Sequence, residues 1–156
     1  MVRIRIENPL QPDLRALLDE GTAWSQSRYT GASNHQSPVA SLSANDVRFC
    51  VARDNDGQPV GAGAVVLHAE WAEIKRLFVT EAARGRDVGR ALLAELEAIA
   101  RAAGATVARL ETGIYSDAAI RLYAAAGFAP CGRFGAHEDD PLSVFMEKRL
   151  GMPERR

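Results

Sequence analysis

Apolar residues recur along this chain with two different spacings, and these spacings predict its helices and strands. The longest helical pattern covers residues 88–104, where apolar side chains three or four positions apart would form one face of a helix. A second pattern over 9–24 places leucines on one face, and a third covers 117–126. Gly104 and Gly127 stand where glycine commonly ends a helix.

Short segments rich in apolar and β-branched residues predict the strands of a sheet. They are residues 2–6, 48–53, 59–68, 73–79, 106–111, 128–134 and 142–150. Residues 54–57 have the composition of a tight hairpin turn, and the polar stretch 25–44 predicts a loop or a short broken helix. The order of elements predicts an α/β fold, a mixed sheet with helices on its faces.

The segment between strand 73–79 and helix 88–104 is a candidate anion site. It contains Arg84, Arg86 and Arg90 together with Gly85 and Gly89. A glycine-containing loop that leads into a helix presents unpaired N–H groups and the positive end of the helix dipole, which suits a phosphate or pyrophosphate. The loop has neither the P-loop signature nor the dinucleotide-binding signature, so those two classes are excluded.

Composition narrows the class of protein. The chain has 156 residues, a net charge of −1 and a pI of about 6.3, which argues against a nucleic-acid binder. It has no apolar run of the ~20 residues that span a membrane, and no signal-peptide core at its start. Cys50 and Cys131 predict free thiols in a reducing cytoplasm. His35, His68 and His137 lack the spacing of metal ligands, so we expect no metal.

Two motifs give the chain a family resemblance. Residues 84–89 read RGRDVG and match the pattern Q/R-x-x-G-x-G/A, the pyrophosphate loop of the GNAT superfamily of acetyl-CoA-dependent N-acetyltransferases. Residues 119–128 read AIRLYAAAGF and are similar to the family segment AIxLYxxxGF. Both occur in the family's order, and the chain resembles the bacterial single-domain type over nearly its whole length. The resemblance implies one N-acetyltransferase domain over residues 1–156.

The resemblance also implies a fold and a set of acetyl-CoA contacts. About seven mostly antiparallel strands would be flanked by helices, with a central pair that splays apart to admit the pantetheine arm. Main-chain groups of one strand would bind that arm, and the arginine-rich loop would bind the pyrophosphate. The implied cofactor-binding residues are Leu77, Phe78, Val79, Arg84, Gly85, Arg86, Asp87, Val88, Gly89, Arg90 and Ser116.

Asp87 departs from the family pattern, which usually has glycine at this position. A carboxylate beside a diphosphate should repel it and weaken cofactor binding. Aspartate is also a preferred N-cap residue, so Asp87 could instead cap the helix that follows. The sequence leaves both interpretations open.

Acetyl transfer needs a base for the acceptor ammonium, a donor to the thioester oxygen and an acid for the departing thiolate. By resemblance, Tyr123 is the acid and Glu73, eleven residues before Arg84, is the base. Glu111 and His137 are alternative bases, and the backbone N–H of Val79 is the expected oxyanion donor. Because neither cysteine lies in a nucleophile motif, we expect direct transfer without an acyl-enzyme.

The acceptor side is the least defined part of the sequence. Trp24, Tyr29, His35 and His137 offer aromatic walls, and the acidic turn 138–140 would suit a cationic acceptor. We expect a small-molecule primary amine as the partner, with no nucleic acid and no membrane, and a homodimer is left open. Protein N-terminal or lysine acetylation, or a non-catalytic acyl-CoA-binding module, are the alternatives.

Overall fold

A computed structural model describes residues 1–29, 31 and 37–151, which fold around a seven-stranded sheet. The sheet order is β1-β2-β3-β4-β5-β7-β6, and every neighbouring pair is antiparallel except the parallel pair β4–β5. This confirms the predicted mixed, mostly antiparallel sheet. The strands are β1 Arg3–Ile6, β2 Val47–Arg53, β3 Pro59–Leu67, β4 Trp71–Val79, β5 Val107–Gly113, β6 Ala129–Pro130 and β7 Ser143–Arg149.

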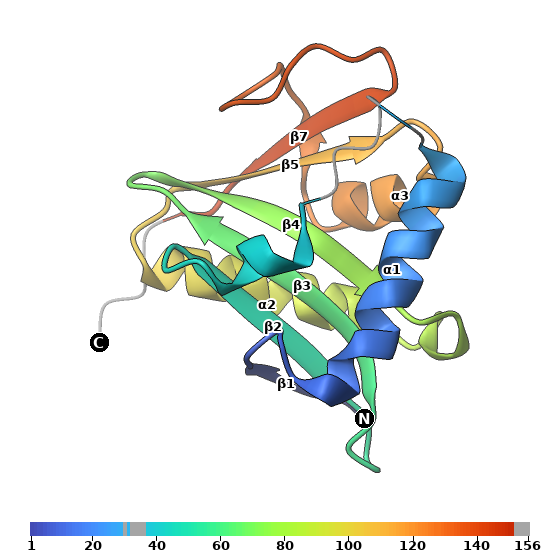
Figure 1. The fold of residues 1–156 in the computed structure, drawn as a ribbon. Coiled ribbons are helices and arrows are strands. Elements are labelled where there is room, and N and C mark those ends of the chain that lie inside the picture. The colour runs from blue at the N-terminus through green and yellow to red at the C-terminus, as the bar shows by residue number, and fades with distance from the viewer. Residues whose placement is uncertain (30, 32–36, 152–156) are drawn as a thin grey trace.

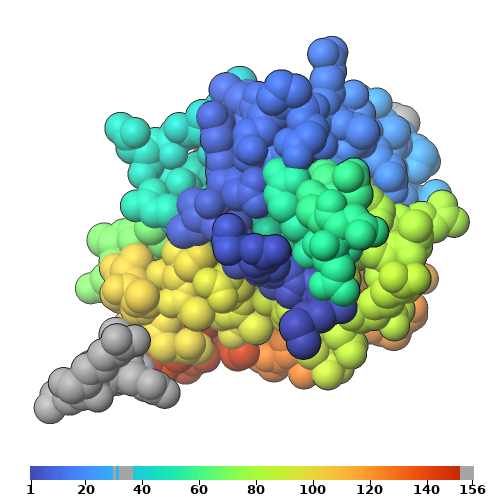
Figure 2. All heavy atoms as spheres, turned by 90° about the horizontal axis from the view of Figure 1, so that it is seen from below, coloured from blue at the N-terminus to red at the C-terminus, as the bar shows by residue number. Residues whose placement is uncertain are grey.

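Helices cover both faces of the sheet (Figure 1), with α1 on one face and α2 and α3 on the other. Seen from below, the N-terminal segment lies at the surface between α1 in blue and α2 in yellow (Figure 2). No helix in the described ranges is long and apolar enough to cross a bilayer. The helices are α1 Arg15–Arg28, α2 Val88–Ala102 and α3 Asp117–Ala125, with short 3₁₀ helices η1 Pro12–Leu14, η3 Val39–Ser43 and η4 Glu81–Ala83.

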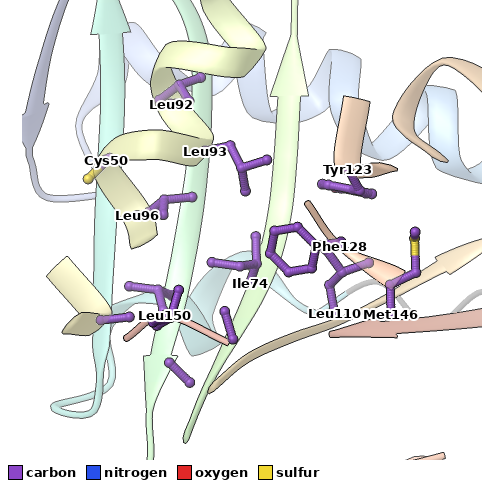
Figure 3. Close-up of a cluster of buried hydrophobic side chains, with 14 of the residues drawn as sticks. Cys50, Ile74, Leu92, Leu93, Leu96, Leu110, Tyr123, Phe128, Met146 and Leu150 are labelled. Carbon is purple, nitrogen blue, oxygen red and sulfur yellow. The ribbon is translucent and has the colours of Figure 1, made fainter. Parts of the chain in front are cut away.

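Two apolar cores hold these layers together. The larger lies between the sheet and α2, where Leu92, Leu93 and Leu96 are almost fully buried against strand residues such as Ile74 (Figure 3). The smaller lies under α1 and is built from Leu14, Leu17, Leu18, Leu42, Phe49, Val51, Ala62 and Ala64. The three- and four-residue spacing of the leucines in α2 therefore marks its buried face, as the sequence predicts.

The central pair β4–β5 parts halfway along its length. Pairing runs from Trp71–Val107 to Ile74–Leu110 and goes no further. At that point a bulge interrupts β4. Ala62 of β3 pairs with Phe78 and Ala64 pairs with Lys75, so two residues of β4 lie opposite the single β3 residue between these pairs. Bulges bend a strand and increase its twist, so the far half of β4 follows β3 and leaves β5. The predicted splay of the central pair is confirmed.

Most predicted bounds agree with the structure to within two residues, and two elements differ more strongly. The first helix was expected over 9–24, but η1 precedes α1, which starts at Arg15 and runs on to Arg28. Proline at the first turn of η1 fixes where helical backbone can begin. The strand expected over 128–134 reduces to Ala129–Pro130, followed by one further hydrogen bond to β7 from Cys131 N–H to the carbonyl of Phe145 at 2.8 Å.

Candidate active site

A cavity of about 860 Å³ lies where β4 and β5 part. Its walls include residues 73–79 of β4, residues 111–113 of β5, the start of α2, the second half of α1 and much of α3. Tyr123 reaches it from the α3 face of the sheet, and Glu73 lies on the α1 face. The splay thus creates a passage through the sheet that connects its two faces.

One side of the cavity has the features expected for a pantetheine and pyrophosphate site. Leu77, Phe78 and Val79 lie beyond the last β4–β5 pair, so their backbone on that edge has no strand partner in the sheet. Such an edge can pair with an extended ligand. The predicted loop residues Arg84, Gly85, Asp87, Val88, Gly89 and Arg90 all line the cavity, whereas Arg86 is exposed and does not.

The backbone of the loop explains its glycines. Gly85 has a φ of 81°, in the region that glycine adopts most easily. At Gly89 an added Cβ would lie 3.2 Å from the side chain of Leu122 and 3.7 Å from that of Val79. Glycine there lets the start of α2 approach both β4 and α3 closely. The loop motif is therefore a packing requirement as well as an exposure of backbone N–H groups.

Asp87 is the N-cap residue of α2, but its side chain makes no capping hydrogen bond. The interpretation that its carboxylate caps the helix is therefore wrong. Its φ of 61° and ψ of 17° place it in the left-handed region, which aspartate tolerates better than most non-glycine residues. This conformation explains why glycine suits the position. Asp87 also lines the cavity, so its carboxylate is placed where it could repel a diphosphate, the second of the two interpretations.

Tyr123 is 7% exposed and lies on α3, where its ring meets Phe128 edge-on at 5.9 Å (Figure 3). Burial raises the pKa of Tyr123, and the negative charge of Glu111 adds to the effect. Among the residues that the structure describes, its hydroxyl has no hydrogen-bond partner. A protonated phenol without a partner, at the wall of the cavity, can donate to a leaving group.

The structure brings Glu73, the base expected from the sequence, together with His137, one of its alternatives. His137 Nε2 lies 2.7 Å from Glu73 Oε2, and Lys75 Nζ is 3.9 Å from the same oxygen. Glu73 is 7% exposed, so this contact is largely shielded from water. The two side chains form one hydrogen-bonded pair, which we call the Glu73–His137 pair.

An aromatic cluster holds His137 over the sheet. Its ring meets Phe134 at 5.0 Å and Phe145 at 5.6 Å, and Phe134 in turn meets Trp71 at 5.5 Å. These contacts fix the loop between β6 and β7. The cluster was not predicted from the sequence, although Trp71 and Glu73 are two residues apart on a strand and so share a face.

Glu111 lies on β5 and lines the cavity as the second carboxylate of the α1 face. Its Oε2 accepts a hydrogen bond from Ser143 Oγ at 2.8 Å. The residue therefore stays a candidate base beside the Glu73–His137 pair. In the described part of the chain no group of three His, Cys, Asp or Glu side chains could hold a metal ion.

Tyr29 connects α1 to the start of α3. Its hydroxyl lies 2.8 Å from Ser116 Oγ and accepts the backbone N–H of Tyr115 at 3.0 Å. Ser116, a predicted cofactor contact, lines the cavity. It is only 5% exposed, and its hydroxyl is hydrogen-bonded to Tyr29. Tyr29 and Trp24 both line the cavity, as predicted for aromatic walls, whereas His35 lies outside the described residues.

The acidic turn does not face the cavity. Glu138 and Asp139 are exposed, and Asp139 pairs with Arg133 at 3.6 Å. Asp140 accepts the backbone N–H of Leu142 at 2.8 Å, and none of the three lines the cavity. The expectation that these carboxylates bind a cationic acceptor is wrong, because the loop turns them outwards and brings His137 inwards.

Comparison with known proteins agrees with this geometry. A profile of the acetyltransferase (GNAT) family matches residues 12–128. An IAA acetyltransferase from Azospirillum brasilense is 44% identical over 151 residues, which cover 96% of this chain and 98% of that protein. A candidate acyl-CoA N-acyltransferase from Klebsiella pneumoniae is 37% identical with a TM-score of 0.82, over 97% of this chain and 99% of that chain.

A more distant structure shares the fold. Phosphinothricin acetyltransferase from Sinorhizobium meliloti, solved in complex with AcCoA, has a TM-score of 0.73 at 22% identity, over 96% of this chain and 89% of that chain. The profile and the full-length relative place the splayed sheet and its loop in a known enzyme class. This chain belongs to the acetyltransferase (GNAT) family, whose enzymes use acetyl-CoA.

Proposed function

We propose that this protein transfers the acetyl group of acetyl-CoA directly to the primary amine of a small molecule. One observation carries the proposal. A phenol that burial keeps protonated, Tyr123, and a buried carboxylate–imidazole pair, Glu73–His137, line the same cavity from opposite faces of the parted sheet. An acid and a base on opposite sides of one passage suit a reaction that joins two substrates there.

The cofactor contacts follow from the free edge and the loop. The backbone of 77–79 would pair with the pantetheine amides as an added strand does. The N–H groups of the loop and the start of α2 would bind the pyrophosphate, with Arg84 and Arg90 supplying positive charge. Ser116 would contribute through its backbone, since its hydroxyl is bonded to Tyr29.

Acetyl transfer needs several proton transfers, and the residues that line the cavity can carry out each of them. The Glu73–His137 pair takes a proton from the acceptor ammonium, and the free amine attacks the thioester carbonyl carbon. A C–N bond forms and the C–S bond breaks, while the backbone N–H of Val79 stabilises charge on the carbonyl oxygen. Tyr123 donates its proton to the departing thiolate and regains one from solvent. The base releases to solvent the two protons that it takes from the amine, so one proton is released overall for each acetyl group transferred.

A small acceptor is supported by the relative with the full-length match, which is named for acetylation of IAA. We further propose that the protein is cytoplasmic and that residues 1–156 form a single N-acetyltransferase domain. Whether it forms a homodimer is left open. A protein N-terminus or lysine as acceptor, or acyl-CoA binding without turnover, are the competing functions.

One assay separates these functions. Thiol release from acetyl-CoA is followed with panels of small primary amines, amino acids and peptides, and products are identified by mass. The proposal predicts turnover with members of the small-molecule panels. Turnover with peptides alone would establish the protein-acetylating alternative, and acetyl-CoA binding without turnover on any panel would establish the binding module.

A further inference from the structure

Arg76 has an unfavourable backbone conformation and a partly buried charge, and packing alone explains neither. It is the bulge residue of β4, and its φ of 53° is a left-handed conformation that is unfavourable for a long side chain. Its guanidinium is partly buried in the cavity wall, and this burial lowers the pKa of Arg76. Backbone strain of this kind clusters at functional sites, so the position calls for a functional account.

The partners of Arg76 among the residues that the structure describes are neutral. Its Nε donates to the carbonyl of Ser37 at 2.9 Å, and one terminal nitrogen donates to Thr22 Oγ1 at 3.1 Å. Among the described residues no carboxylate lies within 4.0 Å of it. A partly buried guanidinium is stable in such a place when a ligand supplies the missing negative charge.

Lys75 extends this positive site. Its Nζ donates to Ser37 Oγ at 3.0 Å, and its nearest acid is Glu73 at 3.9 Å, whose oxygen already contacts His137. Ser37, Lys75 and Arg76 therefore meet at one place, and all three line the cavity. We call them the cation cluster.

The position of the cluster points to the acceptor rather than to acetyl-CoA. Arg76 contacts Thr22 of α1, and the bulge keeps its side chain on the α1 face of the sheet together with Lys75 and Glu73. The loop arginines lie further along the chain: Arg90 is in the first turn of α2 on the other face of the sheet, and Arg84 lies over the ring of Phe78 at 5.7 Å. That loop is the proposed site of the phosphates, which leaves the cation cluster for the acceptor.

We propose that the acceptor carries a carboxylate beside its amine, so that it is an amino acid, and that Lys75 and Arg76 bind this carboxylate. The inference rests on the proposed function and names its substrate class. The acceptor ammonium would face the Glu73–His137 pair while its carboxylate meets Lys75 and Arg76, two and three residues further along β4. Guanidinium and carboxylate groups form strong charge-assisted hydrogen bonds, and within the described part of the chain only two of the N–H donors of Arg76 have an acceptor.

Matched pairs of acceptors test this with the wild-type enzyme. Alanine is compared with ethylamine, phenylalanine with phenethylamine and tryptophan with tryptamine, each assayed for kcat/KM by thiol release from acetyl-CoA. We expect the amino acid to exceed its partner by roughly 10- to 100-fold in at least one pair, the scale of a hydrogen-bonded charge. Amino acid amides, which keep the shape and lose the charge, should react like the simple amines.

Variants then locate the preference in the cation cluster. Arg76→Gln and Lys75→Gln should each bring the ratio of kcat/KM within a pair toward one, mainly by raising KM for the amino acid. Arg76→Lys should restore part of the ratio because it restores the charge. Arg5→Gln, on the exposed edge strand β1, is the matched control and should leave the ratio as in the wild type.

The outcomes separate the two proposals. Amines that react as fast as their amino acids in every pair would overturn the inference and leave the acetyltransferase function standing. A preference that persists in Arg76→Gln and Lys75→Gln would overturn the role of the cation cluster. Bound acetyl-CoA with no turnover of either member of any pair would contradict the small-amine function itself.

Discussion

At the scale of one residue, the general-acid role that we propose for Tyr123 depends on its burial. Because burial raises the pKa of Tyr123, its phenol stays protonated at any pH at which the enzyme would work. Tyr123→Phe keeps the ring against Phe128 and removes the proton, so kcat should fall by about 10²-fold while acetyl-CoA affinity barely moves. The wild type should also show no loss of kcat from this group up to about pH 10, the pKa of a free phenol. Near wild-type kcat for Tyr123→Phe would remove the general-acid role.

The Glu73–His137 pair should act as a unit. Glu73→Gln and His137→Gln should each lower kcat/KM, and the double variant should lose little more than the worse single one, because residues that act together are not additive. The deficit should be largest at low pH and shrink as pH rises, since free amine then accumulates without help from a base. Additive losses would show two independent roles, and an unaltered pH profile for Glu73→Gln would move the base to Glu111.

Asp87 offers a test that separates charge from backbone. Asp87→Asn removes the charge and still tolerates the left-handed conformation, whereas Asp87→Gly removes the charge and relieves the backbone. Both should tighten acetyl-CoA binding by roughly two- to tenfold if the carboxylate repels the diphosphate. Neither should lose a capping contribution, because the side chain makes no cap hydrogen bond. Weaker binding in Asp87→Asn, measured by calorimetry, would show that the carboxylate organises the loop instead.

At the scale of elements, β4 has two tasks that its bulge makes compatible. Its first half pairs with β5 and places Glu73 on the α1 face, while its second half leaves β5 and exposes backbone for a ligand. The sequence predicts the strand, the loop and the helix that follow one another here, because their apolar spacing is regular. It does not predict the bulge at Arg76, since nothing in the local sequence marks an arginine as the residue that turns left-handed.

The contact between α1 and the start of α3 depends on the Tyr29 hydroxyl. Tyr29→Phe leaves Ser116 Oγ and the Tyr115 N–H without their partner, which should cost about 1–3 kcal/mol of unfolding free energy. Thermal unfolding should show a drop in Tm of about 2–4 °C per kcal/mol for a chain of this size. Tyr115→Phe, at an exposed ring, is the control and should stay within about 0.5 kcal/mol of the wild type. Equal effects in the two variants would contradict the proposed link.

At the scale of the whole molecule, the part of the site that the sequence predicts is the part carried by motifs. Tyr123 and the loop residues follow from contiguous segments, so their place at the cavity could be expected. The Glu73–His137 contact and the cation cluster could not be predicted, because they form only where two distant loops pack on the sheet, one bringing Ser37 to Lys75 and the other bringing His137 to Glu73. The orientation of the acidic turn 138–140 was predicted wrongly for the same reason, since the charge of a segment does not show which way a loop faces.

A labelled acetyl group gives the most direct test of whether the acetyl group passes from acetyl-CoA to the amine within one cavity, without an acyl-enzyme. Enzyme is mixed with acetyl-CoA labelled in the acetyl group and an amino acid acceptor, quenched within one turnover and analysed by mass. We predict label on the amine nitrogen of the acceptor, an equal amount of free CoA and no label on the protein at any time. Label on the protein before it reaches the acceptor, or CoA release that does not depend on the amine, would contradict direct transfer.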